Sequence, residues 1–338
     1  MDYSYLDFGL GESSDGGEWV KWIYRATEIL MDIEDGAIFY EEGDEELHCE
    51  NLKGLLDNFP QRLLNFDFEN KKSNPYMKIL ADCINDEIHY FGLEGVQDVS
   101  PSRLLGSIEN ELDSMHFDKE KDNVRRNRDA VSKSLLQYFL GLKAAYSKLM
   151  VIRLDLHTKD DASIVQHWEQ LLKYIAARYA SSFVGYAAKF EYGIERGVHM
   201  HTVLLFNGAV VRQDVTIAKA IGEYWKLQIT HGWGSYFNAN QRDHVAHMKY
   251  RAVGTFCALD DDFVEGLTHM ANYLAKPDLV VKFALPNIGR VFRRGQLKAD
   301  QTHRIARRAA RAGRAQLSAS DDTRGRSLAP VKSRFPLF

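Results

Sequence analysis

Residues 183–206, FVGYAAKFEYGIERGVHMHTVLLF, contain the clearest structural pattern in the chain. Two apolar runs, FVGYAAKFEY (183–192) and VHMHTVLLF (198–206), are rich in β-branched and aromatic residues and predict two strands. The loop between them, GIERG (193–197), is short and is bounded by glycine at both ends, which suits the turn of a β-hairpin. We therefore expect an antiparallel pair of strands here.

The segments around this hairpin predict a sheet with helices packed on it. Residues 148–157 (KLMVIRLDLH) indicate a buried strand, residues 279–285 (LVVKFAL) a last strand, and residues 231–240 (HGWGSYFNAN) a loop or short strand. Apolar residues at helical spacing predict three helices, over 163–180, 215–230 and 263–276. This order of elements is typical of an α+β fold with an antiparallel sheet.

Length and charge divide the chain into regions. A chain of 338 residues corresponds to about two domains. The net charge of −4 conceals an uneven distribution: residues 1–120 carry −19, residues 121–288 carry +5, and residues 289–338 carry +10. An acidic region is a poor binder of nucleic acid, whereas the basic end of the chain suits that partner.

These observations predict three parts. An acidic, mainly helical domain is expected over residues 1–130, an α+β domain over 131–297, and a basic, arginine-rich tail over 298–338 that is helical and then disordered beyond Leu317. The boundary is expected in the highly charged segment 118–133, which is either a linker or a solvated helix.

Cysteine usage and hydropathy narrow the class of protein. Three scattered cysteines, Cys49, Cys83 and Cys257, argue against a disulfide framework or a cysteine zinc site and fit a reducing compartment. The acidic N-terminal sequence lacks the apolar core of a signal peptide. No apolar stretch is long enough to span a bilayer, so no membrane association is expected.

A possible metal site lies in the hairpin. His199 and His201 flank Met200, and residues two apart in a strand point to the same face, about 7 Å apart. If GIERG closes the hairpin, Glu191 pairs across from His199 and shares that face. Two histidines and one carboxylate would leave open positions on an octahedral ion such as Mg²⁺ or Mn²⁺, as a catalytic metal requires.

Other interpretations of these residues stay open. A His-x-His pair in a strand also occurs for purely structural reasons. A slip of one residue in the hairpin register would move Glu191 to the opposite face. Glu195, in the loop, is an alternative ligand.

A second pair of residues lies in THMANYLAKPD (268–278). Tyr273 and Lys276 are three residues apart, which places them on one face of the predicted helix. A phenol has a pKa near 10 and needs activation to act as a nucleophile, which a bound metal and a nearby ammonium would supply. The alternative is that Tyr273 packs in the core and Lys276 is a cation that stabilises the helix C-terminus.

Together the two motifs resemble those of a known superfamily. A His-hydrophobic-His strand followed by a helical Tyr-x-x-Lys is the signature of HUH endonucleases. The stretches KFEYGIERGVHMHTVLLFNG, IGEYWKLQITHGWGSYFN, MANYLAKPD and GRVFRRG are similar to the inovirus replication initiators and to the YagK/YfjJ C-terminal domain of bacterial prophages. The resemblance covers roughly residues 145–297.

The resemblance implies a fold and roles for individual residues. The fold would be the HUH-type antiparallel sheet, ferredoxin-like or RRM-like, with packed helices. His199 and His201 would bind a divalent metal, Mg²⁺ or Mn²⁺, with Glu191 as a further ligand. Tyr273 would be the nucleophile and Lys276 its basic companion, and residues 148–157 would form a central strand with a structural role. No second tyrosine lies three or four residues from Tyr273, which implies a single-tyrosine enzyme.

The implied function is a metal-dependent nickase and strand transferase of single-stranded DNA. It would start rolling-circle replication of a phage or phage-like element in the bacterial cytoplasm, through a 5′-phosphotyrosine intermediate. A relaxase or transposase with the same site, and a DNA-binding regulator without catalysis, remain as alternatives.

Other residues would contact the DNA. Phosphate contacts are expected from Arg293, Arg294, Arg304, Arg307, Arg308 and Arg311, of which the last four share one helical face. Trp233, Tyr236 and Phe237 either stack bases or pack in the core. The N-terminal region carries no motif that we can interpret, and binding of host replication proteins, oligomerisation and regulation all remain open for it.

Overall fold

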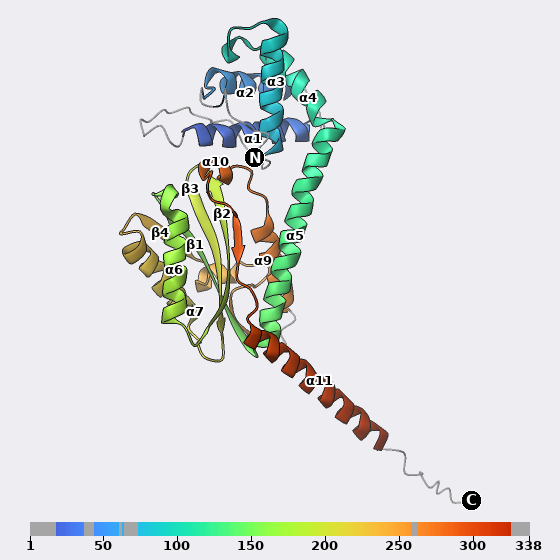
Figure 1. Cartoon of the computed structure of the whole chain (residues 1–338), viewed down its shortest axis with the longest axis vertical. Coiled ribbons are helices and arrows are strands. Elements are labelled where there is room, and N and C mark those ends of the chain that lie inside the picture. The colour runs from blue at the N-terminus through green and yellow to red at the C-terminus, as the bar shows by residue number, and fades with distance from the viewer. Residues whose placement is uncertain (1–17, 37–43, 61–62, 64–73, 258–261, 326–338) are drawn as a thin grey trace, which may run out of the picture.

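The computed structural model describes residues 18–36, 44–60, 63, 74–257 and 262–325. Within them the chain forms an α+β structure in which a helical N-terminal unit lies at one end of a six-stranded antiparallel sheet (Figure 1). The helices of this unit are α1 (Glu18–Gly36), α2 (Asp44–Asp57), α3 (Pro75–Phe91) and α4 (Pro101–Leu112). The expectation of an α+β class with a helical N-terminal region is confirmed.

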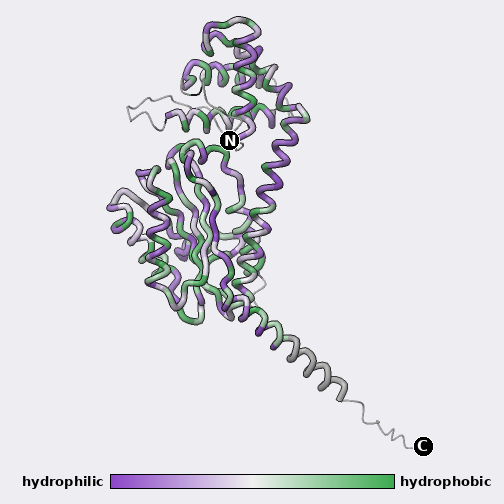
Figure 2. Tube along the Cα trace, in the orientation of Figure 1, coloured by the Kyte–Doolittle hydropathy of each residue, from purple (hydrophilic) through white to green (hydrophobic). Residues whose placement is uncertain are grey.

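Helix α5 (Met115–Ala145) joins the N-terminal unit to the sheet without interruption (Figure 1). Ser114 caps it by accepting the backbone N–H of Phe117 at 3.2 Å. Pairs such as Arg125–Asp122, at 2.9 Å, support the hydrophilic stretch seen in Figure 2. The domain boundary expected at residue 130 therefore falls inside one helix. Of the two alternatives for residues 118–133, a linker or a solvated helix, the structure contains the helix.

The sheet has the strand order β4-β1-β3-β2-β6, with β5 also paired to β1. Its strands are β1 (Lys148–Thr158), β2 (Phe183–Gly193), β3 (Gly197–Asn207), β4 (Gly234–Asn238), β5 (Gly254–Cys257) and β6 (Phe292–Arg294). The hairpin has the predicted register, with Glu191 opposite His199. Gly197 ends its turn with φ +64°, a conformation that favours glycine.

Two helical layers cover the two faces of the sheet. On one face, α6 (Ile164–Arg178) and α7 (Asp214–Tyr224), with the π-helical turn Trp225–Ile229, pack against side chains such as Ile152 and Leu154. On the other face, α5 and α9 (Asp262–Ala275) pack against side chains such as Leu205. Helix α8 (Arg242–Ala246) is a short connection.

Two expectations about the end of the chain are wrong. Residues 279–285 are not a strand but contain the short helix α10 (Val281–Ala284), because the Asp278 carboxylate accepts the backbone N–H groups of Val280 and Val281 at 2.9 and 2.7 Å and starts a helical turn.

The tail helix α11 (Ala299–Gly325) continues past Leu317, where disorder is expected, and ends at Gly325. Residues 326–338 lie outside the described part. No helix in the ranges given above is long and apolar enough to cross a membrane.

Candidate metal and nucleophile site

The site lies on the α5–α9 face of the sheet, at the end nearest the N-terminal unit. Along β1 this face carries the buried residue Val151 and then Arg153, Asp155 and His157. Because directly opposed residues of antiparallel strands share a face, Asp155 lies beside His201 and His157 lies beside His199. Apolar residues thus give way to polar ones along this face.

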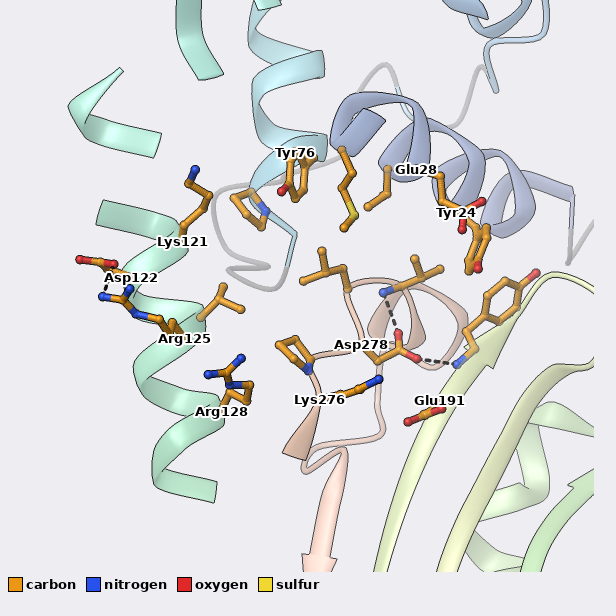
Figure 3. Close-up of a pocket in the computed structure, with 18 of the residues that line it drawn as sticks. Tyr24, Glu28, Tyr76, Lys121, Asp122, Arg125, Arg128, Glu191, Lys276 and Asp278 are labelled. Carbon is orange, nitrogen blue, oxygen red and sulfur yellow. Dashed lines mark hydrogen bonds and ion pairs between the residues drawn. The ribbon is translucent and has the colours of Figure 1, made fainter. Parts of the chain in front are cut away.

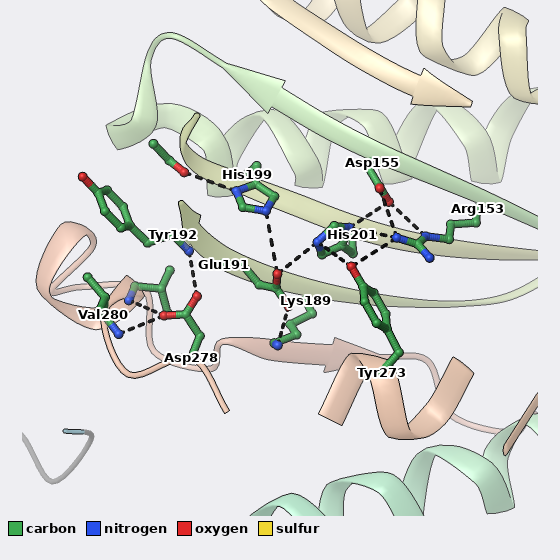
Figure 4. A network of polar contacts seen from close by, with 12 residues as sticks. Arg153, Asp155, Lys189, Glu191, Tyr192, His199, His201, Tyr273, Asp278 and Val280 are labelled. Carbon is green, nitrogen blue, oxygen red and sulfur yellow. Dashed lines mark hydrogen bonds and ion pairs between the residues drawn. The ribbon is translucent and has the colours of Figure 1, made fainter. Parts of the chain in front are cut away.

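Glu191, His199 and His201 form a group whose potential ligand atoms all lie within 4.8 Å of one another. The Glu191 Oε2 atom is 3.0 Å from His201 Nε2 and 3.7 Å from His199 Nε2 (Figure 4). The structure therefore brings together the three residues that the sequence predicts as ligands of a divalent metal.

Hydrogen bonds fix the orientation of both imidazole rings. His199 Nδ1 is 3.2 Å from the carbonyl oxygen of Gly197, and His201 Nδ1 is 2.8 Å from Asp155 Oδ1. Carbonyl and ionised carboxylate oxygens only accept, so each Nδ1 donates its proton; the Nε2 of His201 likewise donates to the ionised Glu191 in this structure, and a bound metal would take the place of that proton. This arrangement of outer partners is common at metal-binding histidines.

Charges around Glu191 keep it ionised. Burial opposes the charged carboxylate, but the hydrogen bond with His201 and the charge of Lys189 outweigh it and lower the pKa of Glu191 to about 2. The Lys189 ammonium, only 3% exposed, forms an ion pair with Glu191. Burial likewise opposes the charged imidazole of His201, yet its hydrogen bonds with Asp155 and Glu191 raise its pKa.

Tyr273 extends from α9 into the same network. Its hydroxyl is 3.0 Å from His201 Nε2 and accepts a hydrogen bond from Arg153 Nη2 at 3.2 Å. The Arg153 guanidinium also lies over the phenol ring, 4.5 Å from its centroid. Burial raises the pKa of Tyr273, and the charge of Arg153 acts in the opposite direction.

Arg153 is itself held in place by a carboxylate. Its Nε and Nη2 atoms each donate to one oxygen of Asp155 at 3.1 Å. This two-point contact fixes the plane of the guanidinium. Asp155 thereby orients both His201 and the cation that contacts Tyr273.

Lys276 does not contact the Tyr273 hydroxyl. Helix α9 ends at Ala275, ahead of Pro277, so Lys276 leaves the helical face that carries Tyr273. Its side chain lines a cavity beside Glu191 instead (Figure 3). In the part of the chain that the structure describes, the cation beside the phenol is Arg153.

The two arginines of β6 point to opposite faces of the sheet. Arg293 lies over the Phe190 ring at 5.4 Å and pairs with Glu169 at 3.4 Å. Arg294 lies over the Tyr138 ring at 5.3 Å and donates to Ser134 Oγ at 2.8 Å. These two side chains are therefore not parts of one continuous surface.

The tail arginines lie at the end of the sheet that is remote from the site. Gln301, near the start of α11, donates to the Val184 carbonyl at the beginning of β2, whereas Glu191 lies near the end of that strand. Helix α11 then extends away from the body of the protein (Figure 1). The exposed tail arginines are Arg304, Arg307, Arg308 and Arg311.

Three aromatic candidates lie on or next to the edge strand β4. Phe237 pairs with Asp155, which places it on the face of the site, and it is 43% exposed. Trp233, just before the strand, is 66% exposed. Tyr236 points to the other face and donates a hydrogen bond to Glu223 at 2.8 Å, so it packs.

Sequence reasoning missed Arg153, Asp155 and Lys189. The signal was present, because polar residues alternate with Ile152 and Leu154 in a strand predicted to be buried. Their partners became identifiable only with the pairing of β1, β3 and β2.

Comparisons of the chain with protein-family models, with curated proteins and with solved structures found no match.

Proposed function

We propose that the chain is a metal-dependent, single-tyrosine nickase and strand transferase of single-stranded DNA, with an HUH-type sheet, that initiates rolling-circle replication of a phage or phage-like element. One observation carries the proposal: the Tyr273 hydroxyl lies 3.0 Å from Nε2 of His201, a member of the possible metal group. A nucleophile next to a cation site is what attack on a phosphodiester requires.

The donor set fits Mg²⁺ or Mn²⁺. Glu191, His199 and His201 would hold the ion, because each offers a ligand atom toward the same point and two outer hydrogen bonds fix the imidazoles. When bound, the ion would polarise the scissile phosphate and stabilise the charge that develops on its oxygens.

Tyr273 would carry out the covalent step. Its oxygen attacks phosphorus and loses its proton, while the bond from phosphorus to O3′ breaks and O3′ gains a proton. The products are a 5′-phosphotyrosine and a free 3′-hydroxyl. A phosphodiester is exchanged for another phosphodiester, so the strand can be rejoined without an external energy source.

Arg153 would help Tyr273 react at neutral pH. The guanidinium contacts the hydroxyl at 3.2 Å and favours the phenolate over the phenol. The Nε2 atom of His201 cannot bind a metal and hydrogen-bond to Tyr273 at the same time. With His201 bound to a metal, the Tyr273 hydroxyl would therefore keep only its hydrogen bond from Arg153. Asp155 positions both side chains.

An adduct assay tests this proposal. Wild-type protein is mixed with tiled single-stranded fragments of the replicon that carries its gene, with Mn²⁺, Mg²⁺ or EDTA, and covalent protein–DNA products are separated on a denaturing gel. Tyr273→Phe and the double variant His199→Ala/His201→Ala are run in parallel. Tyr250→Phe is the matched control, because Tyr250 stacks on His269 outside the metal group.

We expect a metal-dependent adduct with wild type and Tyr250→Phe and none with the other two variants. If wild type binds the fragments but forms no adduct with any of them, the nickase proposal is wrong and a DNA-binding regulator replaces it. An adduct that persists in Tyr273→Phe would preserve the reaction class and reject the assigned nucleophile.

A further inference from the structure

A cavity of about 900 Å³ lies between the N-terminal unit and the site (Figure 3). Its walls come from α1, α3, the first half of α5, the end of β2 and the segment that follows α9. This volume lies within the range of about 300–1,000 Å³ that is usual for ligand pockets.

The walls of this cavity are held together by packing. Trp19 of α1 makes an edge-to-face contact with Phe283 of α10, with ring centroids 6.5 Å apart. Tyr24 of α1 lies 6.2 Å from the ring of Tyr192 in β2. The buried side chains of the N-terminal unit and of α10 belong to one hydrophobic core that extends to the sheet. The N-terminal unit is thus a fixed part of the cavity.

The cavity adjoins the proposed reaction centre. Glu191 and Lys189 belong both to the cavity wall and to the polar network that contains Tyr273. Lys276 also lines it, and within the described residues its ammonium makes no hydrogen bond or ion pair. A strand with its scissile phosphate at an ion held by Glu191 would therefore place a neighbouring nucleotide beside Lys276.

Helix α5 contributes a row of cations. Lys121, Arg125 and Arg128 are spaced four and three residues apart and line the cavity together. Arg125 pairs with Asp122 at 2.9 Å, and both side chains are more than half exposed. Exposed pairs of this kind contribute little to stability, so the guanidinium is readily available to a phosphate.

Five carboxylates line the described wall, those of Glu28, Asp118, Asp122, Glu191 and Asp278, and Asp278 and Glu28 are the two placed so as to oppose an anion near Lys276 least. The Asp278 carboxylate already accepts backbone N–H groups from Tyr192, Val280 and Val281 (Figure 4). Burial raises its pKa. Glu28 lies on α1, across the cavity from the α5 cations (Figure 3).

An apolar surface completes the cavity. Met31 of α1 lines it and is 43% exposed. Pro277 and Leu279 line it as well. Apolar and aromatic groups provide surfaces on which a base can stack, while cations hold the phosphate.

We propose that this cavity binds one nucleotide of single-stranded DNA next to the scissile phosphate, so that the N-terminal unit takes part in substrate binding. Arg125, Arg128 and Lys276 contact phosphate, and the Met31 side contacts the base. This inference rests on the proposed function, since it places the strand relative to Tyr273. It assigns a role to a region whose sequence carries no motif.

Binding of labelled oligothymidylate in EDTA, followed by fluorescence anisotropy, tests the role of the cations. Arg125→Ala/Arg128→Ala is expected to weaken binding about tenfold and to make the salt dependence shallower by about 1.4 in log–log slope. Lys119→Ala/Arg126→Ala removes the same charge from exposed positions of α5 that do not line the cavity, and is expected to change affinity less than twofold. Equal losses in both variants, or none in either, would overturn the proposal.

Filling the cavity provides a test without a change of charge. Met31→Trp is expected to weaken oligothymidylate binding at least about fivefold, because the larger ring occupies the space of a base. Leu47→Trp, at a position of α2 that is 50% exposed and outside the cavity, is the control and should leave binding unchanged. If Met31→Trp binds as tightly as Leu47→Trp, the cavity does not hold the strand.

The same variants separate this inference from the proposed function. If wild type forms the metal-dependent adduct and neither Arg125→Ala/Arg128→Ala nor Met31→Trp weakens binding, the nickase stands and the cavity assignment fails. If wild type forms no adduct but both cavity variants lose oligothymidylate affinity, the cavity binds DNA and the nickase fails. Absence of any oligothymidylate binding by wild type would reject the cavity assignment.

Discussion

The two faces of the central strands differ in what their buried side chains do. On the α6–α7 face, β1 contributes Met150, Ile152, Leu154 and Leu156, each 0% exposed. On the α5–α9 face, the same strand contributes apolar residues first and then charged ones, beginning at Arg153. Burying a charged group costs free energy even when the group has a partner. The charged side chains of the α5–α9 face therefore stabilise the fold less than the apolar side chains of the α6–α7 face. One strand, β1, thus contributes its apolar side chains to stability and its charged side chains to the candidate site.

The largest effect on stability should come from the apolar face. Leu154→Ala removes a fully buried side chain and should lower the free energy of unfolding by about 2–5 kcal/mol. Chemical denaturation measures this loss. The Mn²⁺ affinity of the folded fraction should not change, and a substantial loss of that affinity would show that the two faces are not separable.

Metal addition should stabilise the protein through the other face. At a free Mn²⁺ concentration about 100 times the dissociation constant, wild type should gain about 2.7 kcal/mol of stability. His199→Ala/His201→Ala should gain nothing, because two of three ligands are missing. His116→Ala, at an exposed position outside the metal group, is the control for loss of a surface histidine. An equal thermal shift in the double variant would place the ion elsewhere.

Asp155→Asn, next to Leu154 in the chain, should have the complementary effect. Loss of the carboxylate that accepts from His201 Nδ1 should weaken Mn²⁺ binding about 10–100-fold, or about 1.4–2.8 kcal/mol. Isothermal titration calorimetry measures it. A variant with unaltered affinity would show that Asp155 does not fix the ligand tautomer.

The smallest effect should come from a carboxylate just outside the site. Among the residues that the structure describes, Asp161 has no cationic partner comparable with that of Glu191, and burial raises its pKa to about 6. Its protonated form is favoured by folding, so its stabilising contribution is present below pH 4 and is lost as pH rises through about 6. Asp161→Asn should therefore be slightly more stable than wild type above pH 6 and should lose that advantage at pH 4. Thermal melts of both proteins between pH 4 and pH 7 measure this difference in stability. A stability gain of Asp161→Asn that grows toward low pH would contradict the raised pKa of Asp161.

The hairpin and its three polar residues were predictable because a strand has a period of two. Once GIERG closes the turn, the positions of Glu191, His199 and His201 follow from pairing alone. Tyr273 was predictable as a helical residue, but its distance from His201 depends on how α9 packs on the sheet.

The remaining features depend on contacts that no short pattern contains. Arg153 and Asp155 reach the site through the pairing of β1 with β3, fifty residues along the chain. The position of Lys276 depends on where α9 ends, and the turn that leads into α10 depends on the backbone hydrogen bonds that Asp278 accepts. The cavity combines distant segments, so neither its shape nor its cations could be inferred from the order of residues.

The decisive measurement identifies the residue that becomes linked to DNA. The adduct formed in Mn²⁺ is digested with nuclease and trypsin and analysed by mass spectrometry. The tryptic peptide from Ala252 to Lys282 contains Tyr273 as its only tyrosine, since trypsin does not cleave between Lys276 and Pro277. We predict a 5′-nucleotide on this peptide, at Tyr273. A nucleotide on any other residue, or a nicked strand with no modified peptide, would contradict the account.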